Sequence, residues 1–151
     1  MSINLAGTVR SILQNKGSEV YWLPPEATVY NALEMMAEKK TGALLVIGNG
    51  KLLGVISERD YARKGILQGR MSKETPVSEI MVSPAVTATM DSTVEECMRL
   101  MTENRVRHLP IVDRDKVVGV VSIGDLVKSI ITAQAETIDR LQDYITGKYP
   151  G

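Results

Sequence analysis

Residues 107–126 read RHLPIVDRDKVVGVVSIGDL, and residues 42–61 read GALLVIGNGKLLGVISERDY. The two stretches lie 65 positions apart (107 − 42 = 65), and the same offset relates Ser57 to Ser122 and Asp60 to Asp125. The register holds without a gap over residues 28–61. A repeat this short buries little apolar surface alone, so we expect the two copies to pack on each other. That packing predicts two equivalent clefts lined by the repeated Ser and Asp.

The sequence of each copy predicts a helix, two strands and a second helix. An apolar period of 3.6 residues indicates the first helix, and two apolar runs around a turn indicate the strands. In the first copy these are a helix from Thr28 to Gly42, strands over 43–47 and 52–56, and a helix from Ser57 to about Gln68. In the second copy they are a helix from Thr93, strands over 109–112 and 117–121, and a helix from Ser122 through Tyr144.

A short leading element precedes each copy. Residues 9–13 resemble residues 77–81, at an offset of 68 (77 − 9 = 68). The three extra residues of the first copy fall around residues 17–25. Within that segment, residues 20–23 predict a short strand that ends at a Pro-Pro pair. The counterpart of this strand is residues 85–88.

The composition excludes several classes of protein. The 151 residues are enough for one compact core, and 18 basic against 18 acidic residues give no footprint of a nucleic-acid binder. No apolar run approaches the roughly 18 residues that span a bilayer, and residues 1–5 do not begin a signal peptide. The single Cys97 is interpreted as an apolar filler in a reducing compartment, which favours a cytoplasmic location.

These motifs resemble a tandem pair of cystathionine-β-synthase (CBS) domains, the arrangement called a Bateman module. The second copy carries the resemblance in Val77, Ile80 and Met81, in Ser92, Thr93 and Val94, and in residues 107–113 and 119–126; the first copy carries it in Thr28, Val29 and residues 42–46 and 54–60. The match extends from about Val9 to about Ser129 and leaves no catalytic domain. The first copy departs from the family where Leu45 replaces the usual proline, and its Gly42–Ala43 lacks the basic pair Arg107–His108.

The resemblance implies an α/β (α+β) fold of two β-α-β-β-α units packed pseudo-symmetrically. Its domains would be a first CBS domain over 9–70, a second over 77–131 and a C-terminal helical extension over 132–151, whose apolar residues pack on their own module or on a partner chain. The implied function is a non-catalytic regulatory module that binds AMP, ADP, ATP or NAD, with S-adenosylmethionine a less fitting ligand and no metal. It would form a homodimer and act on a regulated protein partner, with no nucleic acid and no membrane.

The chemical groups of a nucleotide indicate which residues would line these clefts. Asp60 and Asp125 offer carboxylates to the ribose hydroxyls. Ser57 and Ser122 start helices, where free N–H groups favour a phosphate. For adenine we expect Tyr21, Trp22, Thr41, Gly42 and Ala43 in the first cleft, and Ala85, Val86, Arg105, Val106 and Arg107 in the second. Arg59, with Gly124 as its counterpart, would make the two clefts differ in preference.

Each of these residues also has a structural interpretation. Ser followed by Asp three residues later is the pattern of a helix capping box. Arg107 and His108 are either a solvated surface pair or a phosphate clamp, and Arg59 either contacts phosphate or faces solvent. The Met-rich stripe is interpreted as core or dimer face; it comprises Leu33, Met35, Met36, Met98, Leu100 and Met101.

Two other functional classes compete with the nucleotide sensor. The first is a structural dimerisation or interaction module with empty clefts, which nucleotide-dependent stabilisation would separate from a sensor. The second is an enzyme, which the sequence disfavours because it shows no nucleophile–base pair, metal cluster or Walker phosphate loop.

Overall fold

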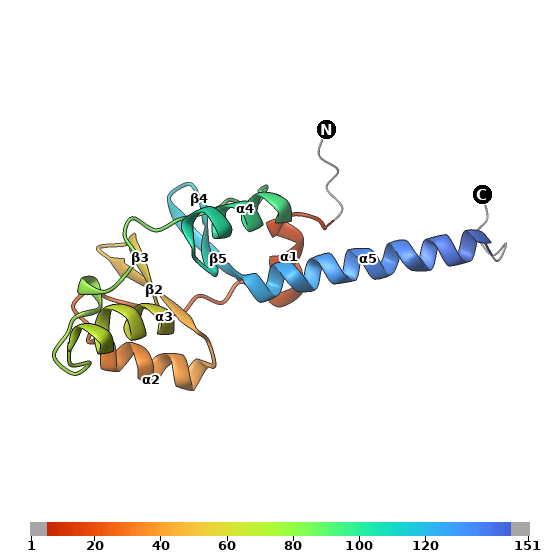
Figure 1. Cartoon of the computed structure of the whole chain (residues 1–151). Coiled ribbons are helices and arrows are strands. Elements are labelled where there is room, and N and C mark those ends of the chain that lie inside the picture. Colours follow the sequence, from red (N-terminus) through yellow and green to blue (C-terminus); the bar gives the residue numbers. More distant parts are fainter. Residues whose placement is uncertain (1–5, 146–151) are drawn as a thin grey trace.

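The computed structural model of the chain describes residues 6–145, with the surroundings of side chains described up to residue 142. Two lobes lie side by side, and a long C-terminal helix extends away from them (Figure 1). The elements are α1 (Val9–Lys16), β1 (Trp22–Leu23), α2 (Val29–Lys39), β2 (Ala43–Gly48), β3 (Lys51–Ser57), α3 (Glu58–Asp60), α4 (Val94–Asn104), β4 (His108–Asp113), β5 (Lys116–Ser122) and α5 (Ile123–Ile145). After α3 the chain continues as a π-helical turn over Tyr61–Gly65 and a 3-10 turn over Ile66–Gln68, and another 3-10 turn covers Val77–Glu79.

The predicted α+β order of both copies is confirmed. Thr28 caps α2 by accepting a hydrogen bond from the Asn31 N–H at 3.1 Å, and Thr93 caps α4 in the same way. Helix α2 ends before the predicted Gly42, because Lys40 takes a left-handed conformation with φ 55°. Both β-hairpins turn through paired residues of positive φ, Asn49–Gly50 and Arg114–Asp115, as tight two-residue turns require.

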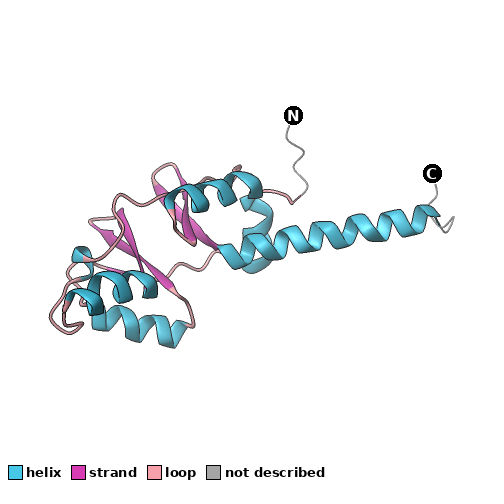
Figure 2. Ribbon diagram, in the orientation of Figure 1, coloured by secondary structure: helices cyan, strands magenta, loops and turns pink. Residues whose placement is uncertain are grey.

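The strands form two small sheets. In the first, β1 pairs with β2 in parallel and β2 pairs with β3 antiparallel, whereas the second contains β4 and β5 as an antiparallel pair. The strands of both sheets lie toward the middle of the molecule, with helices outside them (Figure 2). Strand β3 contacts β5, so the two sheets meet where the two copies meet.

The short strand before β2 has no full counterpart in the second copy. The N–H of Leu45 donates to the Tyr21 carbonyl at 3.1 Å, and this bond holds β1 against β2. The matching position in β4 is Pro110, which has no N–H to donate. Residues 85–88 therefore make only an isolated bridge between Ala88 and Ile111, and the expected second strand is absent there.

The leading elements are exchanged between the copies. Val9 donates its N–H to the Ser92 carbonyl at 2.9 Å, and Val77 donates its N–H to the Ala27 carbonyl at 2.8 Å. Helix α1 therefore completes the core of the second copy, which contains Ala6, Val9, Ile12, Leu13, Val94, Cys97, Met101, Leu109, Ile111, Val121 and Leu126. The 3-10 turn at Val77 completes the first core, which contains Leu23, Val29, Ala32, Met36, Leu44, Val46, Ile56, Val77 and Ile80. The boundaries 9–70 and 77–131 stay predictions for the domains.

The exchange explains the repeated Gly54 and Gly119. A Cβ on Gly54 would lie 2.5 Å from the Val82 carbonyl oxygen, and a Cβ on Gly119 would lie 2.7 Å from Leu13 Cδ1. Each glycine therefore lets the leading segment of the other copy cross close to a strand.

Several smaller predictions can be compared with the packing. Met36 and Met101 are buried in the two cores, and the remaining members of the Met-rich stripe pack partly buried against them. Cys97 is fully buried, and burial, aided by the charge of Glu96, raises the pKa of its thiol to about 11. This environment supports the interpretation of Cys97 as an apolar filler. Within residues 6–145, no helix combines the length and apolarity needed to cross a membrane.

Candidate functional site

Two clefts lie at the junction of the copies. The Asp60 cleft has a volume of about 250 Å³, and its walls include Ser57, Arg59, Asp60, Val86, Arg105, Val106, Arg107 and His108. The Lys16 cleft has a volume of about 420 Å³, and its walls include Lys16, Tyr21, Thr41, Gly42, Ala43, His108 and Ser122. Gly42 and His108 line both clefts, so the two cavities are neighbours.

Each cleft combines the two copies. Ser57 and Asp60 of the first copy face Val86 and Arg105–His108 of the second, while Ser122 of the second copy faces Tyr21 and Thr41–Ala43 of the first. The expected adenine walls of a copy thus lie opposite the Ser-x-x-Asp element of the other copy. Four predicted residues, Trp22, Ala85, Gly124 and Asp125, line neither cleft. Trp22 is half exposed, and Asp125 lines an adjoining pocket that Lys16 also lines.

The Ser-x-x-Asp elements are capping boxes. Asp60 Oδ2 accepts hydrogen bonds from the Ser57 N–H at 3.0 Å and from the Ser57 hydroxyl at 2.9 Å, and the Asp60 N–H donates to Ser57 Oγ at 3.2 Å. Ser122 and Asp125 repeat the two backbone bonds, at 2.8 and 3.2 Å. The capping interpretation is therefore confirmed. Because one oxygen of Asp60 accepts both bonds from Ser57, the same carboxylate can cap its helix and still face the cleft.

The walls of the Asp60 cleft carry both charge and apolar surface. Four arginines line it, namely Arg59, Arg63, Arg105 and Arg107, and its apolar side includes Val55, Val82, Val86 and Val106. Arginine presents a planar fork of donors that fits phosphate oxygens, and branched apolar side chains fit the faces of a purine ring. The arrangement can hold a molecule with a flat apolar end and an anionic end.

His108 lies between the two clefts and is partly buried at the start of β4. Burial lowers the pKa of its imidazole below the ordinary value, and the positive charges of Lys16 and Arg107 lower it further against the opposing effect of Asp125. His108 is therefore neutral near pH 7 in this structure. An anion placed beside it would favour the protonated form.

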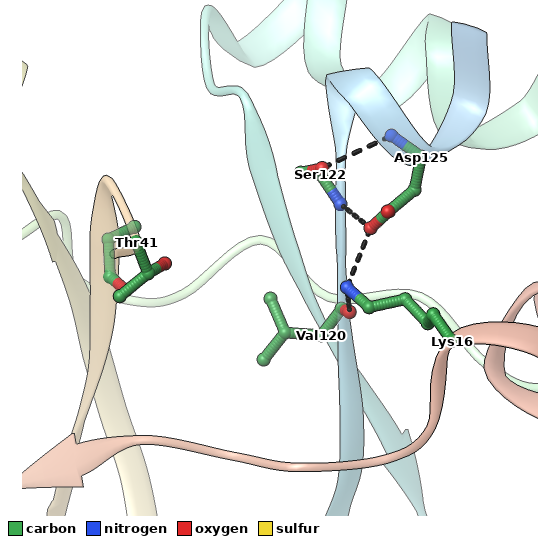
Figure 3. A network of polar contacts seen from close by, with 6 residues as sticks. Lys16, Thr41, Val120, Ser122 and Asp125 are labelled. Atoms are coloured by element: carbon green, nitrogen blue, oxygen red, sulfur yellow. Dashed lines mark hydrogen bonds and ion pairs between the residues drawn. The ribbon is translucent and has the colours of Figure 1, made fainter. Parts of the chain in front are cut away.

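Lys16, on the wall of the Lys16 cleft, forms an ion pair with Asp125 that the sequence did not reveal. Lys16 Nζ donates to Asp125 Oδ2 at 2.7 Å and to the Val120 carbonyl at 3.0 Å (Figure 3). Burial acts to raise the pKa of Asp125, but the Lys16 ammonium and the Ser122 N–H and hydroxyl outweigh it, so the pKa lies below its ordinary value. One oxygen of Asp125 thus accepts from both the Lys16 ammonium and the Ser122 N–H.

The sequence missed Lys16 because its role depends on the exchange. Lys16 belongs to the leading element of the first copy, but α1 packs on the second copy and delivers the side chain to Asp125. The repeat position that matches Lys16 is Pro84 (16 + 68 = 84), so the second leading element brings no lysine to Asp60. The only signal in the sequence was the repeat of the leading element at residues 9–13 and 77–81. That repeat does not indicate which core each leading element joins.

The sequence and the fold can be compared with known proteins. The CBS domain family model matches residues 9–65 and 77–132. The chain belongs to the CBS-domain family. CBS-domain pairs are generally regulatory and signal-transduction modules.

Related CBS-domain proteins occur in plants and bacteria. CBSX3 of Arabidopsis thaliana, a mitochondrial CBS domain-containing protein, is 39% identical and covers 94% of this chain and 73% of its own length. YhcV of Bacillus subtilis is 34% identical over 77% of this chain and 82% of its own. A proposed signal-transduction protein with CBS domains from Burkholderia ambifaria is 48% identical, with a TM-score of 0.80 over 83% of this chain and 94% of its own. Because one relative is mitochondrial, the cytoplasmic location stays a prediction.

In the part of the chain that the structure describes, no group of three or more His, Cys, Asp or Glu side chains could hold a metal ion. His108, the only histidine, lies instead beside arginines and Lys16.

Proposed function

We propose that the chain is a non-catalytic regulatory module that binds a phosphate-bearing adenine nucleotide, AMP, ADP, ATP or NAD, in its Asp60 cleft. The observation that carries the proposal is the composition of that cleft, where a helix-capping carboxylate, a valine-lined wall and four arginines meet. Asp60 would accept hydrogen bonds from the ribose hydroxyls, Val86 and Val106 would contact adenine, and Arg59 and Arg107 would hold the phosphates.

The Lys16 cleft is expected to bind a nucleotide more weakly. Asp125 does not line this cleft and Lys16 bonds to it at 2.7 Å, so a ribose would reach this carboxylate only by displacing an ammonium group. Breaking that ion pair would make the free energy of nucleotide binding less favourable. We therefore expect one nucleotide per chain at low ligand concentration, bound in the Asp60 cleft.

S-Adenosylmethionine fits the Asp60 cleft less well, because it offers no phosphate to the arginines and carries a sulfonium cation. The CBS-domain pair of protein MJ0100 was solved in complex with 5′-methylthioadenosine and S-adenosyl-L-methionine; at 24% identity and a TM-score of 0.71 its likeness to this chain shows the fold alone. Both molecules belong in the ligand panel as tests of the phosphate requirement.

Regulation would follow from where the ligand lies. A nucleotide in the Asp60 cleft would bridge the two copies, because Asp60 belongs to one and Arg107 to the other. It would therefore favour one relative arrangement of the copies over others, and a protein partner would respond to that change. A homodimer is part of the proposal, although the related CBS-CP12 protein of cyanobacteria, at 28% identity and a TM-score of 0.71, is hexameric.

The test is isothermal titration calorimetry on the refolded, ligand-free chain with AMP, ADP, ATP, NAD, S-adenosylmethionine and 5′-methylthioadenosine. The variant is Asp60→Asn, and Asp125→Asn is its matched control because it alters the equivalent cap in the other copy. Asp60→Asn should weaken a phosphate-bearing ligand by about tenfold to a hundredfold, the effect of losing a charged hydrogen bond worth about 1.5–3 kcal/mol.

Two outcomes would count against the proposal. If Asp125→Asn weakens binding and Asp60→Asn does not, the nucleotide binds beside Asp125 and Lys16 and not in the Asp60 cleft. If no adenine ligand produces heat or stabilises the fold, the chain is a structural interaction module whose clefts serve no nucleotide.

A further inference from the structure

Helix α5 leaves the body of the molecule and carries a second apolar stripe. Its first turns pack on the core through Leu126, which is fully buried, and Ile130. Every residue over 134–142 is exposed, and Figure 1 shows this part extending beyond the two lobes. An isolated helical end of this length is only marginally stable in water, which indicates that something covers it.

The exposed apolar residues of α5 follow a heptad spacing. Val127, Ile131, Gln134, Ile138, Leu141 and the position of Ile145 are separated alternately by four and three residues. The exposed fractions of Val127, Ile131, Ile138 and Leu141 are 42%, 60%, 54% and 58%, so none of them packs fully on its own chain. We call the six positions 127, 131, 134, 138, 141 and 145 the α5 seam. Alternation of three and four is the pattern of a coiled coil, whereas a helix that only covers its own core uses a wider stripe.

The residue types of the α5 seam favour two parallel strands. Isoleucine occupies one of the two alternating core positions, at 131, 138 and 145, while Val127, Gln134 and Leu141 occupy the other. β-Branched residues at the first core position with leucine at the second favour parallel dimers. The seam therefore fits a second copy of the same helix.

Gln134 fixes the orientation. In a parallel, in-register pair its amide would face the Gln134 amide of the second copy, and the two can hydrogen-bond to each other. In an antiparallel pair centred on the seam, Gln134 would face Ile138, which would leave an amide without a partner in an apolar layer at a cost of about 1–3 kcal/mol. The parallel arrangement is therefore favoured.

The charges of α5 do not oppose this pairing. The positions that flank the seam over 130–142 are Ile130, Ala135, Thr137 and Gln142, all uncharged. Glu136, Asp139 and Arg140 fall on outer positions of the helix, where they stay in water. A groove of about 460 Å³ includes the seam residues Gln134 and Ile138, and Ile130 and Ala133 add apolar surface to it.

We propose that α5 pairs with α5 of a second copy as a parallel, in-register two-stranded coiled coil through the α5 seam. The pairing does not depend on the proposed nucleotide site, which lies at the junction of the lobes. It joins two CBS-domain pairs through their C-terminal helices.

Cysteine crosslinking tests the orientation. Leu141→Cys should form a disulfide-linked dimer under mild oxidation, because this position meets itself in the parallel pair. Arg140→Cys is the matched control, one residue away on an outer position, and should remain unlinked. Cys97 is buried, so the unmodified chain reports the background. If Leu141→Cys stays monomeric but links in a mixture with Ile131→Cys, the pair is antiparallel and the proposal is wrong.

Sedimentation equilibrium tests the interface. Ile138→Asp should raise the dimer dissociation constant by at least about tenfold, because the seam would receive a charge, whereas Arg140→Asp should not. Both side chains are exposed in the single chain, so circular dichroism should show an unchanged fold of the two lobes. A monomeric unmodified chain, or a dimer that Ile138→Asp leaves intact, would overturn the proposal.

Discussion

At the residue scale, the two clefts differ by a few charged side chains. Asp60 and Asp125 occupy equivalent capping boxes, but only Asp125 accepts from a lysine, Lys16, at 2.7 Å. The Lys16 side chain is about two-fifths exposed, so solvent screens the pair and its contribution to stability is modest. The larger effect of Lys16 is that its positive charge offsets the negative charge of the Asp125 carboxylate.

Lys16→Met tests the ion pair through its pH dependence. Because the folded-state pKa of Asp125 is lowered, the pair stabilises the fold above the unfolded-state pKa of about 3.9, and the stabilisation is lost as the pH falls through the folded-state pKa. Lys16→Met should lower the free energy of unfolding by about 0.2–1 kcal/mol at pH 7 and by less at pH 3, as measured by urea denaturation. Lys128→Met is the control, and an equal loss at both pH values would contradict the prediction.

His108 should make nucleotide binding depend on pH. Its imidazole has a lowered pKa and is neutral in the free chain, and a bound phosphate would favour its protonated form. Binding would then take up a proton, so the affinity for AMP should rise as the pH falls below about 6.5, the ordinary pKa of histidine. Calorimetry at pH 6 and pH 8 measures this, with adenosine as a phosphate-free control. His108→Gln should flatten the AMP profile, and a profile that it leaves unchanged would assign the effect elsewhere.

At the element scale, the exchange of leading elements places strict demands on single strand positions. Strand β3 carries Gly54 where Val82 crosses it, and the Val55 N–H donates to the Val82 carbonyl at 3.1 Å. Strand β5 carries Gly119 where the Leu13 side chain crosses it. The obstacle is rigid backbone in one case and a side chain that can rotate in the other.

Gly54→Ala should therefore destabilise the protein more than Gly119→Ala. A new Cβ would lie 2.5 Å from a hydrogen-bonded carbonyl oxygen in the first variant and 2.7 Å from Leu13 Cδ1 in the second. We expect about 1–3 kcal/mol for Gly54→Ala, the usual range for overpacking, and a smaller loss for Gly119→Ala. Thermal and urea unfolding of both variants measure the difference. The reverse order would show that the crossing at Gly54 relaxes more easily than the contacts imply.

At the scale of the whole molecule, neither sequence repeat is a complete core by itself. The first core needs Val77 and Ile80, which follow the first repeat in the chain, and the second core needs residues 6–13, which precede the first repeat. The two copies are thereby tied at both ends, and the clefts lie in the junction that this arrangement creates.

Fragments of the chain test this organisation. Residues 17–82 contain every member of the first core, whereas residues 1–70 contain the first sequence repeat but lack Val77 and Ile80. We expect the fragment 17–82 to unfold cooperatively and the fragment 1–70 to be largely unfolded, since small domains have little stability to spare. Circular dichroism with thermal unfolding measures both. Equal folding of the two fragments would contradict the assignment of the exchanged turn to the first core.

The sequence by itself determined the repeat, the order of helices and strands, the hairpin turns and the capping residues, because spacing and turn chemistry are local. It also selected Ser57, Asp60, Arg107 and His108, which the structure brings to one cleft. The tertiary structure alone decided which core each leading element joins, and thus that Lys16 reaches Asp125. The reason is physical: two similar leading segments fit two similar cores, and only the packed chain shows that each lies on the core of the other copy.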